Sequence, residues 1–448
     1  MIVPSVRRAL AVLAGALVAA TLLSGAAAAE DDGKDDSGSK SDDTEKVQED
    51  PVRAAEYWLD EYGVTDAWKT TKGKGATIAV IDTGIGDGAD ELDGAVAAGT
   101  DVSGSGADDG RTPVGAVDRN HGTLVGSIAA ARGTGKGKGF VGVAPQAELL
   151  SISVGFGASA AVPFVEQVPD AIRWAVDHGA DVINMSWTTN TTGWDESWDD
   201  AFLYAFEHDV VVVVAAGNRG SGTESVGAPA TIPGVLVVGG VDRQQDISKD
   251  ASTKGITIGV TAPSEGLLGL TPDGEMVGWN GTSGAAPIVS GIAALVRSAH
   301  PDLDANNVIN RIVSTTTAVD GVELPDADYG FGLIDAEKAV ASDVAHVDSN
   351  PVSSLTLEEW VHQHRRAESA PDEFEPPTAE PDVPQLEAAD APTKETSPWL
   401  PSPESLREGT LPIVALTGAG ILLALGLVAV VRRTRSVRSS RRKPSTSD

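Results

Sequence analysis

The sequence contains no cysteine, so no disulfide bond can hold its fold together. Lys and Arg number 33 against 65 Asp and Glu, which leaves a formal net charge of −32. Such an acidic chain is a poor partner for DNA or RNA, and nucleic acid is therefore not expected to bind. No repeat of fixed period is present either, which argues against a solenoid. The fold must depend on buried apolar side chains, and a domain of about 290 residues buries enough surface for that.

An uninterrupted apolar run from Ala9 to Leu23 follows two arginines at the start of the chain and ends near small residues at Ala29. This layout is typical of a secretory signal peptide and predicts one over residues 1–29, with a first membrane helix as the alternative.

A second apolar run, residues 411–431, carries no charge and is long enough to cross a bilayer core of roughly 30 Å. We therefore predict a single transmembrane helix there, with an interior helix as the alternative. Residues 432–448 are rich in Arg, and positive residues next to a span stay on the cytoplasmic side. The chain between the two apolar runs is then expected to lie outside the cytoplasm.

The net negative charge is concentrated in two stretches. Residues 30–50 and the Pro-rich residues 345–410 lack the apolar side chains needed to offset chain entropy. The first is predicted to be a disordered acidic segment and the second a linker. Residues 51–344 remain as the folded domain.

Within residues 51–344, apolar runs of strand length alternate with helical patterns. The strand candidates are 76–82, 148–154, 181–187, 210–218 and 234–242, and the helix candidates are 121–133, 165–180 and 197–209. Continuous apolar strands separated by helices predict an α/β fold, with a doubly wound, mostly parallel sheet covered by helices on both faces. In such sheets functional groups gather at the carboxyl ends of the strands.

Four polar residues stand at such places. Asp82 ends the run AVID, His121 begins a predicted helix, and Asn218 follows VVAAG. Ser283 lies between glycines in WNGTSGAAPIVSG, where another helix is predicted to begin. Taken singly, each residue is explained equally well by a turn or a helix cap. A DTG motif such as that of Asp82 also occurs in aspartic proteases, but those need a second carboxylate and no second DTG is present.

A helix start gives Ser283 chemical advantages. Its backbone N–H is one of the unsatisfied donors of the first turn, and its hydroxyl lies in the positive field of the helix dipole. Both favour a negative charge that develops on a nearby oxygen. An Asn side chain such as that of Asn218 supplies a second donor for the same purpose.

These stretches resemble the signature motifs of the subtilases, the subtilisin-like serine proteases. DTG, HGT, AAGN and GTSGAAP match the four signatures, and GVAP and VINMSW match two further landmarks. The resemblance implies that Ser283 is the nucleophile, His121 the general base and Asp82 the residue that orients the imidazole. It also implies an oxyanion hole formed by Asn218 and the backbone N–H of Ser283.

The same resemblance implies a substrate-binding site made of two short stretches, namely Ser186, Trp187 and Thr188 together with Ala215, Ala216 and Gly217. This chain departs from the usual subtilase pattern in two places. Gly284 stands where many relatives carry Met, and Trp187 and Thr188 replace Leu and Gly. The second departure argues against a broad, deep specificity pocket.

The loop RGTGKGKGFVGVAP occupies the region in which subtilisins bind calcium. It offers Lys136 and Lys138, whereas calcium requires carboxylate and carbonyl oxygens. We therefore expect no calcium in this loop, no catalytic metal and no cofactor.

The order of segments is similar to that of the mycosins, the membrane-anchored subtilases of actinobacterial type VII secretion systems. A short N-terminal extension without room for a globular propeptide precedes the protease domain, and a linker, a span and a short tail follow it. The resemblance implies a single-pass cell-membrane protease that acts on protein or peptide substrates beside a type VII secretion complex. The alternative is a structural component that stabilises a membrane secretion complex, with proteolysis secondary or absent.

Overall fold

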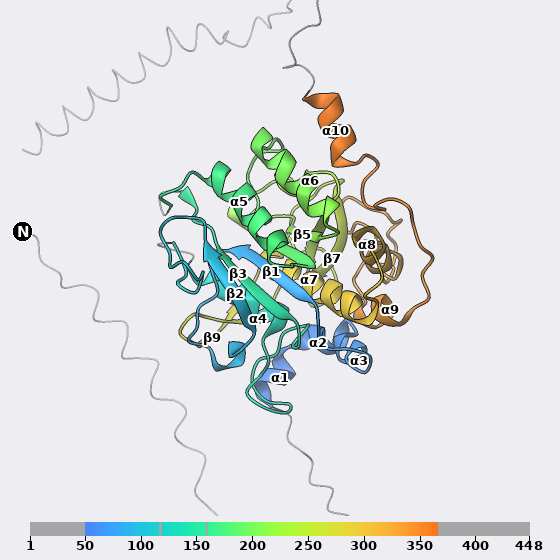
Figure 1. Cartoon of the computed structure of the whole chain (residues 1–448). Coiled ribbons are helices and arrows are strands. Elements are labelled where there is room, and N and C mark those ends of the chain that lie inside the picture. The colour runs from blue at the N-terminus through green and yellow to red at the C-terminus, as the bar shows by residue number, and fades with distance from the viewer. Residues whose placement is uncertain (1–49, 116–118, 158–159, 366–448) are drawn as a thin grey trace, which may run out of the picture. The chain divides into compact units, whose positions relative to one another are not determined.

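The computed structural model describes residues 50–115, 119–157 and 160–365 (Figure 1). The predicted signal peptide, nearly all of the acidic segment 30–50, the predicted transmembrane helix 411–431 and the basic tail lie outside the described residues. Among the helices that are described, none is both long enough and apolar enough to cross a bilayer.

A seven-stranded sheet forms the centre of the fold, in the order β2-β3-β1-β4-β5-β6-β7. Every neighbouring pair is parallel, which confirms the predicted doubly wound parallel sheet. The strands are β1 (Thr77–Asp82), β2 (Val96–Asp101), β3 (Glu148–Ser153), β4 (Val182–Met185), β5 (Val211–Ala215), β6 (Leu236–Val241) and β7 (Ile258–Pro263). The apolar runs predicted five of them. They did not predict β2, whose residues are only partly buried at one edge of the sheet, or β7.

Alternating side chains of β1 contact different helix layers. Ile78 and Val80 belong to the apolar cluster of α4 (His121–Ala130) and α7 (Thr282–Ala299). Ala79 and Ile81 belong to the cluster of α5 (Phe164–Asp177) and α6 (Asp199–Glu207), which lie side by side in Figure 1. Helices therefore cover both faces of the sheet, as the strand and helix alternation predicts.

Two of these helices contain a proline, Pro169 in α5 and Pro287 in α7. Proline has no N–H, so the carbonyl four residues earlier loses its helical partner. In α5 that carbonyl belongs to Val165, and it accepts a hydrogen bond from Trp198 Nε1 at 3.2 Å. A side chain from a neighbouring segment thus replaces the missing donor, and the predicted helix continues past Pro169.

The remaining elements surround this core. They comprise α1 (Pro51–Ala55), α2 (Tyr57–Glu61), α3 (Val64–Ala67), the antiparallel pair β8 (Leu267–Leu270) and β9 (Met276–Trp279), α8 (Ala305–Ser314), α9 (Ala336–Ala341) and α10 (Leu357–His364).

The folded part of the chain continues beyond residue 344, where the composition predicted a linker. In α10 the indole of Trp360 lies 4.3 Å from that of Trp194, measured between ring centroids. Arg365 Nε then pairs with Asp199 Oδ2 at 2.9 Å. The composition of residues 345–410 is acidic and Pro-rich and gives no indication of these contacts. The folded part therefore extends to Arg365, beyond the boundary predicted at 344.

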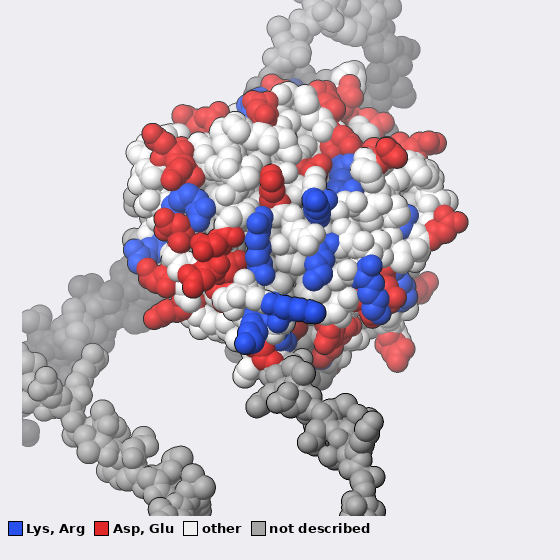
Figure 2. All heavy atoms as spheres, turned by 60° about the horizontal axis from the view of Figure 1, so that its bottom comes forward, with Lys and Arg blue, Asp and Glu red and all other residues white. Residues whose placement is uncertain are grey.

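The charge of the chain is unevenly spread over its folded part. On the face shown in Figure 2, Lys and Arg side chains gather along the middle, and Asp and Glu side chains surround them. Opposite charges therefore lie close together on this face, although the whole chain carries a net charge of −32.

The N-terminal helices are part of the core. The side chain of Trp58 is fully buried, and Tyr57 Oη donates to the carbonyl of Glu265 at 2.7 Å. Trp68 Nε1 donates to the carbonyl of Val143 at 2.8 Å. The short extension ahead of the first strand is therefore packed against the domain.

The same extension holds the lysine-bearing loop. Glu56 Oε1 accepts a hydrogen bond from the backbone N–H of Val141 at 2.8 Å, and Arg53 donates to the carbonyl of Lys138 at 3.2 Å. Both contacts lie on the C-terminal side of the turn at 135–138. In the described part of the chain, no cluster of three or more Asp, Glu or His side chains is suited to holding a metal ion.

Glu56 is buried with an exposed fraction of only 1%. Burial raises the pKa of Glu56 to about 8, although the hydrogen bond from Val141 and the charge of Arg53 act in the opposite direction. The carboxyl group is therefore protonated at neutral pH in the folded protein and ionised in the unfolded chain.

We expect the free energy of unfolding to fall as the pH rises from 4.5 to about 8, because unfolding releases a proton from Glu56 in this window. The slope from this one group approaches about 1.4 kcal/mol per pH unit. Glu56→Gln keeps an acceptor for Val141 but cannot ionise, so urea unfolding at a series of pH values should show a flatter profile. Glu358→Gln, which removes an exposed carboxyl, should keep the wild-type slope. An equal slope in wild type and Glu56→Gln would contradict this assignment.

Candidate active site

Asp82 is the last residue of β1 and is fully buried. Its Oδ1 accepts the backbone N–H of Thr83 at 2.7 Å. Both carboxylate oxygens also contact His121 Nδ1, at 2.8 and 2.9 Å. The carboxylate accepts hydrogen bonds, so this contact places the ring proton on Nδ1.

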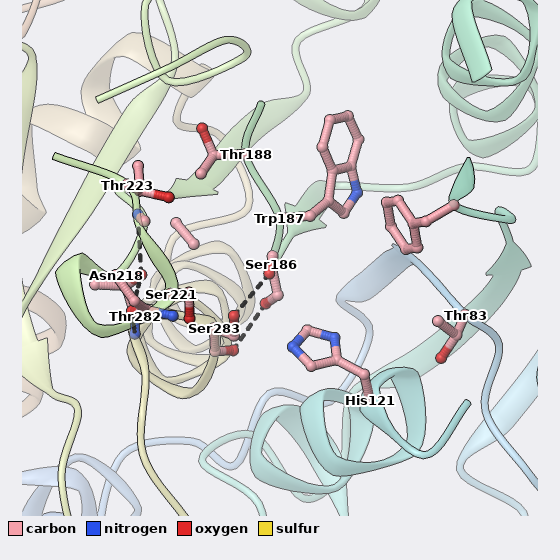
Figure 3. A pocket seen from close by; sticks show the side chains of 13 residues that line it. Thr83, His121, Ser186, Trp187, Thr188, Asn218, Ser221, Thr223, Thr282 and Ser283 are labelled. Carbon is pink, nitrogen blue, oxygen red and sulfur yellow. Dashed lines mark hydrogen bonds between the residues drawn. The ribbon is translucent and has the colours of Figure 1, made fainter. Parts of the chain in front are cut away.

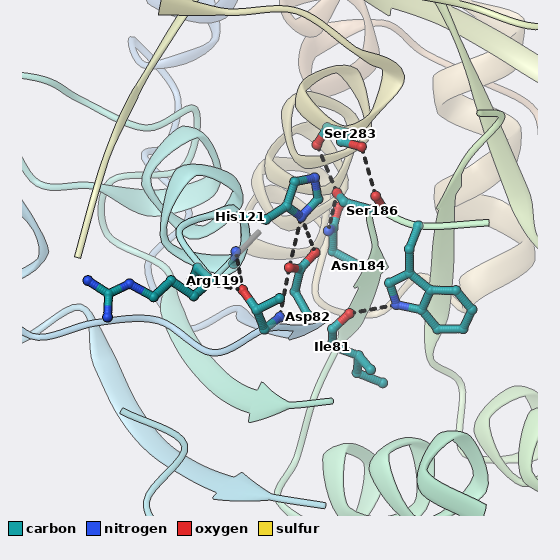
Figure 4. A network of polar contacts seen from close by, with 10 residues as sticks. Ile81, Asp82, Arg119, His121, Asn184, Ser186 and Ser283 are labelled. Carbon is teal, nitrogen blue, oxygen red and sulfur yellow. Dashed lines mark hydrogen bonds and ion pairs between the residues drawn. The ribbon is translucent and has the colours of Figure 1, made fainter. Parts of the chain in front are cut away.

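His121 begins α4 and its side chain is 26% exposed. The neighbouring Gly122 N–H donates to Thr83 Oγ1 at 2.8 Å, which ties the helix start to the end of β1. The imidazole also meets the indole of Trp279 edge to face, with ring centroids 5.8 Å apart. In Figure 4 the ring lies between Asp82 and Ser283.

Ser283 lies in the first turn of α7, as the sequence predicts, and is partly exposed. Its hydroxyl donates to the carbonyl of Ser186 at 2.8 Å. The side-chain hydroxyl of Ser186 donates in return to the carbonyl of Ser283, also at 2.8 Å. The structure therefore shows the serine hydroxyl directed at a backbone oxygen beside the imidazole.

Asn218 follows β5, and its amide orientation is fixed by its neighbours. The side-chain oxygen accepts from the backbone N–H of Thr282 at 2.8 Å and from its hydroxyl at 3.0 Å. A backbone N–H can only donate, so the oxygen must face Thr282 and the amide nitrogen must face away from it. The donor end of Asn218 is thus set without any bound molecule.

A cavity of about 310 Å³ joins these groups (Figure 3). Its lining consists of Thr83, His121, Phe156, Ser186, Trp187, Thr188, Ala215, Gly217, Asn218, Ser221, Thr223, Thr282 and Ser283. Asp82 lies behind His121 and does not line it. Of the residues predicted to bind substrate, only Ala216 is missing, because its side chain is fully buried in the core.

The size of Trp187 argued against a broad, deep specificity pocket, and the structure shows where this side chain lies. Its Nε1 donates to the carbonyl of Ile81 at 2.9 Å, and its ring packs against Phe164 at 5.0 Å between centroids. Phe156, another lining residue, lies 6.2 Å from the same indole. Trp187 therefore forms an aromatic wall at one end of the cavity.

Two threonines that line the cavity pack beside Gly217. A Cβ atom added to Gly217 would lie 2.7 Å from the methyl carbon of Thr223 and 2.9 Å from that of Thr188. Thr188 is held there because its hydroxyl donates to the carbonyl of Gly227 at 2.9 Å. The sequence pointed to Thr188, but nothing in it singled out Thr223, which lies between strands without a motif.

Gly284 leaves room for residues that pack over the start of α7. A Cβ atom at this position would lie 2.4 Å from Leu267 Cδ1 and 3.3 Å from the indole of Trp279. These two side chains, from β8 and β9, occupy the space that a larger residue after Ser283 requires. The departure from the usual pattern is thus compensated by packing.

The model of the subtilase family matches residues 73–332, which include all four residues of the site. The chain belongs to the subtilase family. The match covers more than half of the sequence, and the parallel sheet and the helix starts described above lie within it.

Several characterised subtilases are similar in sequence. A halolysin-like extracellular serine protease of Natrialba magadii is 33% identical over 67% of this chain, and the chain spans about half, 54%, of that protein's length. Mycosin-4 of Mycobacterium tuberculosis is 34% identical over 62% of this chain and 67% of its own length.

A solved subtilase structure has the same fold. It is that of the serine protease MycP1, described as an essential component of the type VII (ESX-1) secretion system. The TM-score is 0.54 at 30% identity, over 64% of this chain and 88% of the other.

Proposed function

We propose that this subtilase is a serine endopeptidase that hydrolyses peptide bonds through Ser283, His121 and Asp82. The observation that carries the proposal is the convergence of these three residues, 39 and 162 positions apart along the chain, at one edge of the sheet. His121 Nδ1 contacts the buried Asp82 carboxylate, and the imidazole shares a cavity with Ser283.

Each group has a defined part in the reaction. The Ser283 hydroxyl turns from the Ser186 carbonyl to His121, gives up its proton to the imidazole and attacks the substrate carbonyl. His121 passes that proton to the leaving amine, and a water molecule later hydrolyses the acyl-enzyme. Asp82 stays ionised and stabilises the imidazolium.

The negative charge on the substrate oxygen needs donors that are already in place. The Asn218 amide nitrogen, fixed by Thr282, is one, and the Ser283 backbone N–H at the start of α7 is the other. One such donor contributes about 10² to 10³ in rate, because it needs no reorganisation during the reaction.

A fluorophosphonate probe tests the nucleophile. We expect labelling of the wild-type protein, no labelling of Ser283→Ala and reduced labelling of His121→Ala, because the probe reacts with a serine that a neutral imidazole activates. Gel fluorescence measures it, with circular dichroism as the control for folding. A folded wild-type protein that never reacts would be inconsistent with the proposal and would indicate a pseudoenzyme or a blocked cleft.

The cavity favours a small side chain at the residue that precedes the scissile bond. The methyl groups of Thr188 and Thr223 pack beside Gly217, which reduces the space for a large substrate side chain in this part of the cavity. The substrate class supported best is therefore a peptide with Ala or a similarly small residue there.

Replacing Thr188 by Gly removes one of these methyl groups. We expect kcat/KM for a peptide with Phe before the scissile bond to rise by about tenfold or more relative to the Ala peptide, since pocket sterics are worth that much. Thr192→Gly, an exposed position outside the cavity, is the matched control. An unchanged ratio in Thr188→Gly would mean that this threonine does not limit the substrate.

We further propose that the protease acts outside the cytoplasm, anchored to the cell membrane by residues 411–431, within a type VII secretion system. The similarity to Mycosin-4 and MycP1 and the order of apolar segments in the sequence support this role. The second candidate, a structural component of a secretion complex, rests on the description of MycP1 as an essential component of such a system.

Ser283→Ala separates the two roles in cells that use the protein. If proteolysis serves export, export of partner proteins is expected to stop in this variant, because only the hydroxyl is removed and the fold remains. Immunoblots of culture supernatants measure it, with deletion of the whole gene as the reference. Export that continues while cleavage ceases would favour the structural role.

A further inference from the structure

The carbonyl of Ser283 lacks the usual i+4 donor of an α-helix. The residue four positions later is Pro287, which lacks the N–H that an α-helix uses to satisfy that carbonyl. The carbonyl instead accepts the hydroxyl of Ser186 at 2.8 Å. A side chain at the end of β4 thus replaces the missing helical donor at the residue that carries the nucleophile.

A series of buried polar side chains orients that hydroxyl, and Figure 4 shows two of them, Asn184 and Ser186, beside Ser283. Ser290 Oγ donates to Asn184 Oδ1 at 2.8 Å, and Asn184 Nδ2 donates to Ser186 Oγ at 2.9 Å. The exposed fractions of the three side chains are 0% for Ser290 and Asn184 and 1% for Ser186. All three are almost completely buried, so each lost bond leaves a buried group unsatisfied.

The direction of every bond in this chain is determined by one fixed end. The carbonyl of Ser283 can only accept, so the Ser186 proton must point to it. The Ser186 oxygen is then left to accept from the Asn184 amide nitrogen, and the Asn184 oxygen accepts from Ser290. This series of hydrogen bonds therefore runs from Ser290 in the middle of α7, through Asn184 and Ser186, back to Ser283 at the start of α7.

The backbone of Ser186 completes the arrangement. Its carbonyl accepts the Ser283 hydroxyl at 2.8 Å, so residue 186 holds residue 283 by both its main chain and its side chain. At Pro169 in α5 the replacement donor is Trp198 Nε1, at 3.2 Å. The replacement in α7 is shorter and is supported by two further buried side chains.

We propose that Ser186, oriented by Asn184 and Ser290, is a positioning residue for the nucleophile. The Ser186 hydroxyl holds the Ser283 carbonyl and thereby fixes the backbone conformation at Ser283. That conformation sets the positions of the Ser283 N–H and of the Ser283 hydroxyl. The role rests on the proposed function, because it concerns the same serine. Without this bond the first turn of α7 relaxes, and a displacement of about 1 Å at a reacting group costs on the order of 100-fold in rate.

Ser186→Ala tests the proposal, since it removes the hydroxyl and keeps the backbone carbonyl. With active sites counted by fluorophosphonate labelling, kcat per labelled site should fall on the order of tenfold to a hundredfold. KM for the same peptide should stay within about twofold, and the pH profile of kcat/KM should keep its shape, because the contact between His121 and Asp82 is untouched. Simple loss of folded protein would lower the number of labelled sites and leave kcat per site unchanged.

Ser290→Ala removes the first donor of the same series of hydrogen bonds. It replaces Ser186→Ala as the test if that variant folds poorly. Its effect on kcat should be smaller, and the double variant with Ser186→Ala should be no slower than Ser186→Ala alone, because Ser290 acts through Ser186. Full additivity of the two effects would contradict this coupling.

Ser127→Ala is the matched control. Ser127 is fully buried, donates to the carbonyl of Leu124 at 2.7 Å and accepts from the N–H of Leu270 at 3.1 Å, away from Ser283. It should lower the unfolding temperature and leave kcat per labelled site unchanged. Wild-type kcat per site in Ser186→Ala, or an equal loss in Ser127→Ala, would overturn the positioning role alone. A wild-type protein that shows neither labelling nor turnover would overturn the proposed function as well.

Discussion

The parallel pairing of β1 with β3 on one side and β4 on the other is the constraint on which the site depends. Parallel strands end at the same edge of a sheet, so Asp82 at the end of β1 lies near Ser186, just after the end of β4. Asn218, after β5, reaches the same edge. Two helices, α4 and α7, then begin there and supply His121 and Ser283.

Around that edge the protein repeatedly satisfies backbone groups that proline or a helix end leaves without a partner. The Asn218 side-chain oxygen accepts a hydrogen bond from the N–H of Thr282. The Ser186 hydroxyl donates to the carbonyl of Ser283, and Trp198 Nε1 donates to the carbonyl of Val165. Buried polar groups are costly when unpaired, so these bonds are as important to stability as to chemistry. The same contacts fix the Asn218 amide and the start of α7 at the lining of one cavity, where a substrate is expected.

Much of this arrangement was predictable, and the exceptions have physical causes. Five of the seven strands and the starts of α4 and α7 follow from apolar periodicity. Residue size did not reveal that the indole of Trp187 donates to the carbonyl of Ile81 and forms one wall of the cavity. Thr223 was missed because it lies in a loop without a motif. The packing of α10 was missed because acidic composition over a long window outweighed two tryptophans and an arginine that find partners far along the chain.

The sequence by itself determined the class of fold and the identities of Asp82, His121, Asn218 and Ser283, because apolar periodicity and short motifs are local properties. The tertiary structure alone decided which way the Ser283 hydroxyl points, how wide the cavity is and what holds the start of α7. Those features depend on contacts such as Ser186 with Ser283 and Thr188 with Gly217, between residues that no local pattern relates. Hydrogen-bond direction and steric fit act over a few ångströms, and only folding brings distant residues within that range.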